Sequence, residues 1–274
     1  MRFSVRNGFC LDLFLPHIIN LIKKNEMKKF KSSGLVLLLT IALLSCSKDG
    51  ESTSDSTSLI LPKKINYIEN TSNDKVGKDT YFTYNGNKIV SDIYDGKSKN
   101  IYTYTGDFIT KVESFDYAKL TYTMDYSYTN GKLTSVTEKE TSYPSVTTNF
   151  IHNTDGTVLY SSIYGKGKLT FKDGNLIEDA SENNGTETYE YDTKNNPFKN
   201  VLGVSLLLYN YKESGAHLNT AKNNYIKRTD KYNGIISVLS TSIITYNSNG
   251  YPIVDSENNE GLTGFYASYK YYYD

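Results

Sequence analysis

A motif that recurs along the chain constrains its fold more than any other feature. Two aromatic residues flank a polar one, a turn containing glycine follows, and apolar and polar residues then alternate. The clearest copies are Tyr81–Val90, Tyr102–Val112 and Tyr126–Val136, and weaker ones are Phe150–Tyr160 and Leu169–Ile177. Aromatic and β-branched residues favour half-buried strands, while Asn-Gly and Asp-Gly tolerate the positive φ angles of a two-residue hairpin turn. Each copy therefore predicts one β-hairpin.

The spacing of the copies predicts how the hairpins are joined. Corresponding aromatic residues of successive copies lie about 20 to 24 residues apart, and the interval that includes the weaker Phe150 copy is about twice as long. A regular spacing of this size indicates a repeat architecture. Parallel pairing would need long crossovers, for which this spacing leaves no room. The pattern continues at Tyr189–Asp192 and Ile244–Tyr246 and ends in the aromatic run Phe265–Tyr273. We expect an all-β domain, an antiparallel meander of repeated β-hairpins forming a curved sheet, and leave open whether the sheet closes.

One stretch, Asn196–Tyr209, interrupts the repeats. Its apolar residues recur at helical spacing, and Pro197 stands near its start, where proline suits a first helical turn. The positions in this pattern are Phe198, Val201, Leu202, Ser205, Leu206 and Tyr209. They predict one short helical insertion near 198–209 that covers a face of the sheet. A buried strand over Val204–Leu208 is the alternative, and residues 212–224 resemble a loop.

Tyrosine dominates the aromatic residues, with 26 tyrosines and no tryptophan in the chain. The two rings of a Tyr-x-Tyr pair lie on the same face of a strand. Phenol rings can pack against cross-strand neighbours while their hydroxyls reach polar partners, so packing is the favoured interpretation. A continuous aromatic stripe that stacks on sugar rings is the alternative.

The N-terminal part of the chain has the pattern of an export signal. Lys28, Lys29 and Lys31 precede the apolar run Leu35–Leu44, which is too short to span a membrane. The run ends in Leu-Leu-Ser-Cys, with the cysteine at Cys46, and resembles a bacterial lipobox. That resemblance implies that Cys46 is the lipidation site, acylated with palmitate or a similar fatty acid, and becomes the first residue of the mature protein.

The lipobox divides the start of the chain into three parts. We expect residues 27–45 to form the lipoprotein signal peptide, with Met27 as its initiator, and residues 1–26 to be a mis-called upstream extension. Residues 46–59 have almost no apolar content and predict a flexible tether. Its acidic patch, Lys48–Glu51, resembles the export signal of Bacteroidota lipoproteins that reach the cell surface, and a solvated linker is the alternative. Residues 60–274 form the repeat domain.

Removing residues 1–45 makes the chain acidic. That segment holds seven of the 30 basic and two of the 30 acidic residues, so 23 basic and 28 acidic residues remain. A mildly acidic chain without a basic block does not favour nucleic-acid binding. The two cysteines are Cys10 and Cys46. With the first removed and the second acylated, we expect no disulfide.

The repeat units are similar to the YD (RHS-type) repeats of bacterial surface proteins. Gly131–Val136 is the closest match, and the Tyr-Asp pair itself stands at Tyr191-Asp192. Together with the lipobox and the break at Asn195–Phe198, they resemble a Bacteroidota lipoprotein family of unknown function with YD/RHS-like repeats. The resemblance covers about residues 60–274. It implies an architecture and carries over no catalytic residue.

Few residues suggest catalysis or metal binding. His152 stands where other repeats place their second tyrosine, which predicts a strand residue that replaces an aromatic one. His217 has the surroundings of a solvated loop, and two distant histidines do not make a zinc site by spacing. The chain lacks a Gly-x-Ser-x-Gly elbow, a glycine-rich phosphate loop and the ligand series of an EF-hand. We expect no catalytic residue, no metal site and no cofactor.

Carboxylates are the remaining route to catalysis. A glycosidase needs two of them about 5 to 10 Å apart, and pairs such as Glu138 with Glu140 or Glu187 with Glu190 could provide this. The sequence does not select one pair, and charged residues on strands commonly protect sheet edges. An enzyme is therefore not the expected function.

These observations favour an outer-membrane lipoprotein, lipid-anchored and facing the cell surface. We expect a non-catalytic module that binds a glycan or a protein partner on a tyrosine-rich face, with the membrane contacted through the lipid and no nucleic-acid partner. A structural or accessory component of an envelope complex is the alternative. A carboxylate-dependent hydrolase is the third hypothesis.

Overall fold

The computed structural model describes residues 59–70, 75–183, 185–208, 220–259 and 265–274. Cys46, the expected signal peptide, nearly all of the expected tether and His217 lie outside the described residues. Sixteen strands are described, with these bounds: β1 Pro62–Asn70, β2 Lys75–Asn85, β3 Lys88–Tyr94, β4 Ser98–Thr105, β5 Phe108–Asp116, β6 Lys119–Thr129, β7 Lys132–Glu140, β8 Val146–His152, β9 Val158–Ser162, β10 Gly165–Lys172, β11 Asn175–Ser181, β12 Gly185–Tyr191, β13 Tyr225–Tyr232, β14 Ile235–Tyr246, β15 Pro252–Asn259 and β16 Phe265–Tyr273.

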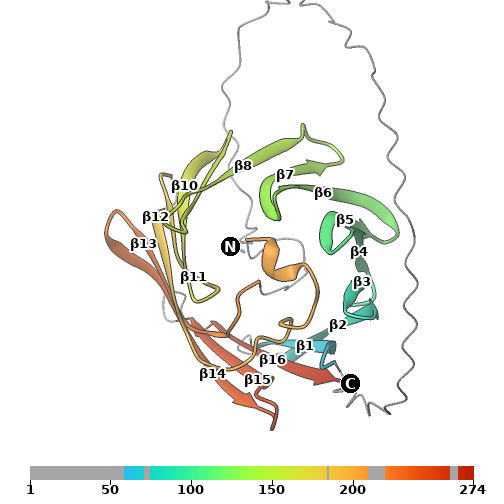
Figure 1. Ribbon diagram of the computed structural model, residues 1–274. Helices are drawn as coiled ribbons and strands as arrows, with labels where there is room; N and C mark the ends of the chain where they lie inside the picture. The colour runs from blue at the N-terminus through green and yellow to red at the C-terminus, as the bar shows by residue number, and fades with distance from the viewer. Residues whose placement is uncertain (1–58, 71–74, 184, 209–219, 260–264) are drawn as a thin grey trace, which may run out of the picture. The chain divides into compact units, whose positions relative to one another are not determined.

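The strands form a closed antiparallel barrel (Figure 1). Each pairs with its neighbours in the sequence, which confirms the predicted meander. The first and last strands also pair, from Ile65 opposite Tyr271 to Glu69 opposite Ala267. An open curved sheet is therefore wrong. Closure removes the two free strand edges that an open meander would expose.

A β-bulge follows the turn in each of the three clearest hairpins. Tyr84 pairs with Ile89, Tyr104 with Ile109 and Tyr128 with Leu133, and the register shifts by one residue at each position. The residues that pair with these tyrosines are fully buried, since Ile89, Ile109 and Leu133 are at most 1% exposed. In the third hairpin Asn130 and Gly131 have φ angles of 51° and 76°, as a type I′ turn requires.

The inward-facing tyrosines are anchored through their hydroxyls. The Tyr128 hydroxyl donates to the Ile109 carbonyl at 2.9 Å and the Tyr84 hydroxyl donates to the Pro62 carbonyl at 2.8 Å. His152 bonds the Leu133 carbonyl through Nε2 at 2.8 Å and takes the tyrosine's place in its hairpin, as predicted. Together with their contacts to the buried core, these bonds confirm the packing interpretation of the tyrosine pattern.

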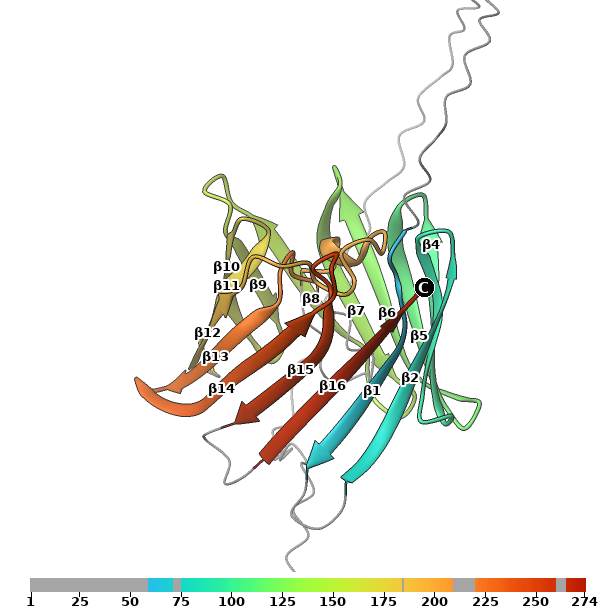
Figure 2. The same ribbon diagram turned by 90° about the horizontal axis from the view of Figure 1, so that it is seen from below.

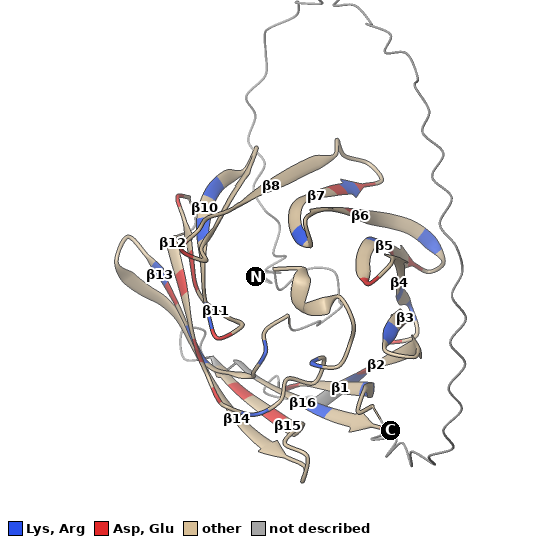
Figure 3. Ribbon diagram, in the orientation of Figure 1, with Lys and Arg blue, Asp and Glu red and all other residues tan. Residues whose placement is uncertain are grey.

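The outer face of the barrel is rich in polar and charged residues. Along β6, Met124 and Tyr126 are buried inside, while Asp125, Ser127 and Thr129 are exposed outside. Ion pairs lie on the same outer face, such as Lys111–Glu113 and Lys227–Glu190, both at 2.7 Å. Charged residues are spread over most of the strands (Figure 3). The tyrosines that pack against the core, such as Tyr126 and Tyr128, thus face inward, and many of the charges face water.

The inserted segment contacts the hairpin turns at one end of the barrel, and we call its residues 192–208 and 220–224 the cap. A ring of 16 strands is too wide for strand side chains alone to fill. The cap lies inside the ring (Figures 1 and 2) and adds Phe198, Val201, Val204 and Leu207 to the core that Ile89 and the other buried strand residues form.

The cap is held by hydrogen bonds to the hairpin turns around it. The Leu202 N–H donates to the Asn87 carbonyl at 2.9 Å, and the Asn195 N–H donates to the Gly250 carbonyl at 2.9 Å. The Asn200 side chain donates to the Ile60 carbonyl at 3.0 Å. The ring of Phe198 packs edge-on against Phe82 with centroids 5.4 Å apart. The cap is therefore part of the folded barrel.

The predicted helical insertion is confirmed only as a single short turn. The 3-10 helix η1 (Val204–Leu206) is the one helical element among the described residues, and Tyr209 lies beyond them. Gly203 precedes it with a φ of 80°, a left-handed conformation that stops a longer helix from running through this point. The alternative strand over Val204–Leu208 is wrong. Within the described parts of the chain, no helix has the length and apolar character needed to cross a membrane.

Candidate functional site

A pocket of about 540 Å³ opens beside the cap. The β10–β11 turn, the inner face of β11, the end of β12 and the cap form its walls. The lining residues are Lys172, Asp173, Asn175, Ile177, Tyr189, Tyr191, Asp192, Thr193, Lys222 and Asn223. The pocket is an open depression at the surface and not an enclosed cavity.

Two tyrosines of β12 provide the aromatic wall of the pocket. Tyr189 and Tyr191 are two residues apart on the inner face, with ring centroids 6.4 Å apart and planes inclined by 38°. The Tyr191 hydroxyl donates to the Leu176 carbonyl at 2.7 Å, and the Tyr189 hydroxyl donates to Glu187 at 2.5 Å. Because both hydroxyls are fixed, the rings are held in place and their half-buried faces line the pocket.

Two asparagines form a rigid polar edge. Asn175 donates through Nδ2 to the side-chain oxygen of Asn223 at 3.0 Å, and the Asn223 N–H donates back to the Asn175 side chain at 2.9 Å. Asn223 also donates to the Lys194 carbonyl at 2.7 Å. This edge joins the β10–β11 turn to the returning part of the cap. Lys172, Asp173 and Lys222 form an exposed charged rim beside it.

Asp192 connects the pocket to the rest of the cap. Its carboxylate accepts hydrogen bonds from the Lys194 N–H at 2.9 Å, the Asn224 N–H at 3.2 Å and the Tyr246 hydroxyl. These donors come from both halves of the cap and from β14. Asp192 therefore fixes the pocket's shape as well as lining it.

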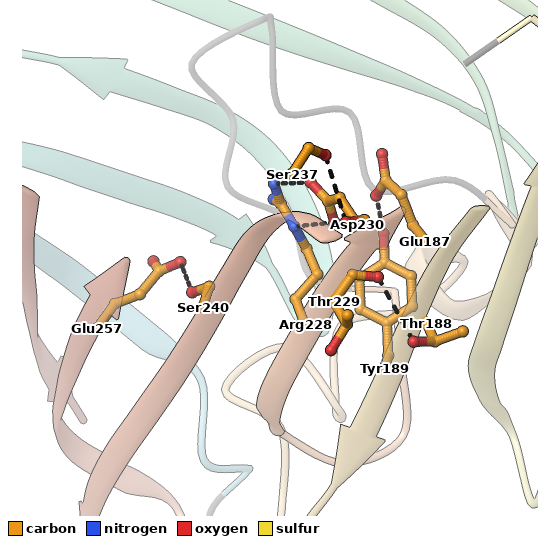
Figure 4. A network of polar contacts seen from close by, with 9 residues as sticks. All are labelled: Glu187, Thr188, Tyr189, Arg228, Thr229, Asp230, Ser237, Ser240 and Glu257. Carbon is orange, nitrogen blue, oxygen red and sulfur yellow. Dashed lines mark hydrogen bonds and ion pairs between the residues drawn. The ribbon is translucent and has the colours of Figure 1, made fainter. Parts of the chain in front are cut away.

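A polar network covers the inner face of β12–β15 beyond the pocket (Figure 4). The Arg228 guanidinium donates twice to Asp230, at 2.9 Å from Nε and 2.6 Å from Nη2. The Ser240 hydroxyl donates to Glu257 at 2.5 Å. Glu187 accepts from Tyr189 and so links the network to the pocket wall. Hydroxyl–carboxylate pairs are thus the recurring unit of the inner face.

Three carboxylates of this region are direct cross-strand neighbours. Asp179 pairs with Glu187 across β11 and β12, and Glu187 pairs with Asp230 across β12 and β13. Burial, followed by the charge of Glu187, raises the pKa of Asp179 to about 6, although Tyr160 donates a hydrogen bond to it at 2.9 Å. Like charges directly opposite one another destabilise a sheet, and of these three only Asp230 is paired with an arginine.

Asp255 is the most exceptional carboxylate of the inner face. It is 9% exposed, and its Oδ1 and the neighbouring Ser242 hydroxyl are buried without a hydrogen bond of good geometry. Burial raises the pKa of Asp255 to about 7, against the opposing effect of the Ser242 hydroxyl beside it and with smaller upward contributions from Glu257 and Asp192.

The pKa values of three buried carboxyls predict a loss of stability with rising pH. Burial raises the pKa values of Asp92 and Asp179 to about 6 and the pKa of Asp255 to about 7. Because these values exceed the ordinary value of about 3.9, their stabilising effect is complete below about pH 4 and is lost as pH rises through 6 to 7. Between pH 5 and 7.5 we expect Asp255 alone to cost about 2 kcal/mol of unfolding free energy.

Urea unfolding at both pH values measures this effect. Asp255→Asn should reduce the difference between the two pH values by about the amount assigned to Asp255. Asp125→Asn, which changes an exposed outer carboxylate, is the control and should leave the difference unchanged. Equal pH dependence in wild type and Asp255→Asn would contradict the assignment.

The structure places the residues considered from sequence as follows. Glu187 and Glu190 lie on opposite faces of β12, since Glu190 pairs with Lys227 outside. Glu138 faces inward and accepts from Tyr122 at 2.5 Å, whereas Glu140 is exposed at the end of β7. His152 lies in β8, as expected. Among the described residues, no group of three or more histidine, cysteine or acidic side chains is placed to hold a metal ion.

Sequence reasoning missed the pocket and the buried acids. One signal was present in the sequence: polar residues occupy alternate positions of β14 and β15 that face inward, where a core would carry apolar residues. These residues are Ser240, Ser242, Asp255 and Glu257. Without knowing which face closes on the barrel interior, that alternation resembles an ordinary solvated face.

Comparison with known proteins adds little to this description. No protein-family model matches the chain, and no curated protein matches it. Among solved structures, the chain is similar to a porin-like protein from Bacteroides uniformis. The two share 12% sequence identity with a TM-score of 0.49, and the match covers 78% of this chain and 98% of that one.

Proposed function

We propose that this protein is a lipid-anchored outer-membrane lipoprotein whose barrel stands in water, faces the cell surface and binds a glycan in the pocket beside the cap. Binding occurs without catalysis. The observation that carries the proposal is the pair of rigid tyrosine rings in a pocket edged by fixed amides.

The outer face of the barrel supports its placement in water. A barrel that spans a bilayer presents an apolar band to lipid and a polar interior. Here Asp125, Lys111 and Glu113 lie on the outer face of the middle strands, where a membrane barrel would carry apolar residues. A lysine in the middle of a bilayer costs about 2 to 4 kcal/mol at a lipid-facing position. The barrel therefore needs a separate anchor, for which the lipobox cysteine Cys46 is the candidate.

The pocket chemistry supports a sugar ligand. Sugar rings present apolar C–H faces and polar hydroxyl edges, which suit aromatic faces and amide or carboxylate groups respectively. Tyr189 and Tyr191 provide the first, while Asn175, Asn223 and the charged rim provide the second. The bonds that fix these side chains reduce the ordering cost of binding.

Glycan-array screening of the purified protein followed by calorimetry tests the proposal. We expect at least one glycan to bind, and Tyr189→Leu to weaken its affinity about tenfold or more, because a ring contact of about 1.4 kcal/mol is lost. Tyr164→Leu, which changes a 69% exposed ring outside the pocket, should bind as wild type. An empty array, or unchanged binding by a folded Tyr189→Leu protein, would contradict glycan binding.

A carboxylate-dependent glycoside hydrolase is the second candidate. Asp179 and Glu187 are directly opposite, and the pKa of Asp179 is raised to about 6, which suits a general acid. Prolonged incubation with the bound glycan distinguishes the two functions. Product release that is lost in Glu187→Gln would favour the hydrolase, and an intact glycan would favour binding alone.

A further inference from the structure

Exposed aromatic and branched apolar side chains gather at the end of the barrel opposite the cap. The turns of an antiparallel meander alternate between its two ends, and the cap contacts the turns of one end. The β5–β6, β7–β8, β9–β10 and β13–β14 turns therefore lie at the other end. We call the most exposed apolar side chains in or beside these turns the distal tips. They are 54% to 78% exposed and comprise Tyr117, Tyr143, Ile163, Tyr164, Tyr232 and Ile235.

Exposed apolar residues elsewhere on the barrel have a different placement. Among the described residues, Tyr81, Ile151 and Ile243 are also more than half exposed, and each lies within a strand of the outer face. Single apolar residues on a protein surface are ordinary. The distal tips are instead grouped at one end of the barrel, where Ile236, which is 55% exposed, adds to them. A group of this kind indicates an interaction surface.

The turns that carry the distal tips are held in place by hydrogen bonds. The Tyr117 N–H donates to the Lys97 carbonyl at 3.1 Å. The Tyr164 N–H donates to the Ser162 hydroxyl at 3.1 Å, and the Asn183 side chain donates to the Tyr164 carbonyl at 2.9 Å. The exposure of these side chains is therefore a property of ordered turns.

The β5–β6 turn keeps its exposed tyrosine in an unfavourable backbone conformation. Tyr117 and Ala118 have φ angles of 46° and 64°. Four other described turns with two positive φ angles carry the residues that tolerate them: Asp95-Gly96, Asn130-Gly131, Asp173-Gly174 and Asn233-Gly234. Because Tyr117 is 72% exposed, its packing does not offset the strain. Strain that packing does not explain points to a function for the side chain.

The arrangement of the distal tips suits a lipid surface better than a protein surface. Neighbouring hairpins of a sheet lie two strand spacings apart, about 10 Å, so the tips are separate projections. The polar β11–β12 turn, with Glu182 and Asn183, stands between two of them. A stable protein interface needs about 1,000 Å² of continuous contact, whereas each tip can enter a fluid interface by itself. Tyrosine favours the headgroup layer, since its ring is apolar and its hydroxyl stays in water.

The proposed lipid anchor permits contact between the distal tips and the membrane. β1 begins beside the cap, where the Asn200 side chain bonds the Ile60 carbonyl, and its nine residues extend about 30 Å. Residues 46–59 could span at most about 45 to 50 Å. Acyl chains on Cys46 can therefore enter the same bilayer that the distal tips contact. The pocket beside the cap then faces away from the membrane.

We propose that the distal tips insert into the headgroup layer of a lipid bilayer, so that the barrel stands on the membrane with its cap and pocket outward. The tyrosine and isoleucine side chains at the turns enter the interface, and the outer face of the strands stays in water. This surface is distinct from the glycan pocket and does not depend on it.

Cosedimentation with phosphatidylcholine vesicles tests the proposal. The protein is the mature chain, residues 46–274, without acyl chains, so that binding reports the barrel alone. We expect the wild type to sediment with the vesicles. The double variant Ile163→Ser, Tyr164→Ser should bind about tenfold less tightly, the effect of withholding roughly 60 Å² of apolar surface from lipid. Ile243→Ser, on the outer face of β14, is the control and should bind as wild type.

A second variant separates membrane binding from folding. Replacing Tyr117-Ala118 by Asn-Gly gives the turn residues that tolerate positive φ angles. We expect Tyr117→Asn, Ala118→Gly to raise the urea midpoint of unfolding and to lower vesicle affinity about threefold or more. A lower urea midpoint would contradict the claim that the tyrosine is kept at a cost to the fold.

The remaining outcomes decide which partner the distal tips contact. Wild-type protein that stays in solution, or equal vesicle binding by folded Ile163→Ser, Tyr164→Ser, would overturn the membrane contact. Concentration-dependent self-association without lipid, lost in the same variant, would assign the surface to a second copy of the chain and would also overturn it. Glycan binding is measured separately on the array, so its failure and the failure of this proposal are distinguishable.

Discussion

Replacing Phe198 with alanine is expected to lower the unfolding free energy by about 3 to 5 kcal/mol, the usual cost of truncating a buried phenylalanine. The Phe198 ring is 2% exposed and packs edge-on against Phe82 of β2. It belongs to the cap, so its removal leaves a cavity where the cap meets the barrel wall. Urea unfolding monitored by tyrosine fluorescence measures the loss.

Ile243→Ala is the matched control for this prediction. Ile243 is 77% exposed on the outer face of β14 and should lose less than about 1 kcal/mol. If Phe198→Ala and Ile243→Ala lower the unfolding free energy by similar, small amounts, the claim that the cap is part of the core would be contradicted. A large change at Phe198 that leaves the unfolding transition cooperative would support a barrel and cap that fold as one unit.

Replacing Cys46 with alanine is expected to abolish fatty-acid labelling of the protein and to release it from the membrane. The thiol is the acylation site that the lipobox resemblance implies. Buried acyl chains provide the membrane affinity of a lipid anchor, and the ion pairs on the outer face of the barrel do not favour contact with lipid. Metabolic labelling with palmitate and fractionation of membranes measure both effects.

Ser47→Ala is the control for the lipid anchor, since it changes the neighbouring residue and keeps the thiol. It should be labelled and retained as wild type. Unchanged labelling of the Cys46→Ala protein would contradict the lipoprotein proposal.

Local sequence patterns were sufficient to predict the hairpins. The Tyr-x-Tyr and Asn-Gly patterns depend on residues close together in the chain. They therefore predict the two strands and the turn of Tyr126–Val136, and the role of His152 as a substitute for an aromatic residue. Strand pairing between neighbours in sequence followed from the short turns. These features depend on contacts between residues that are near one another in the chain, so local sequence patterns are enough to predict them.

Closure of the barrel and the shape of the cap depend on distant contacts. The pairing of β1 with β16 joins residues about 200 positions apart, and no local pattern marks it. The helical spacing of Phe198 and Val201 was real, but it reflects successive turns that point into the barrel. Gly203 and the hydrogen bonds to Asn87 and Gly250 replace the expected helix.

The candidate site could not be predicted for the same reason. Asn175 and Asn223 are 48 residues apart in sequence and meet only because the cap returns to the β10–β11 turn. Asp255 is an ordinary acidic strand residue in the sequence and becomes exceptional only when the barrel buries it. Burial, which depends on closure, turns these common residues into a site.

The central claim is that the barrel of this protein stands in water and is not embedded in lipid. Asp125→Cys provides a labelling position in the middle of the outer face of β6, and no other described residue is a cysteine. A fluorophore attached there, on membrane-anchored protein, should be quenched by iodide in solution and unaffected by nitroxides on lipid acyl chains. Quenching by the lipid nitroxides with protection from iodide would contradict the account.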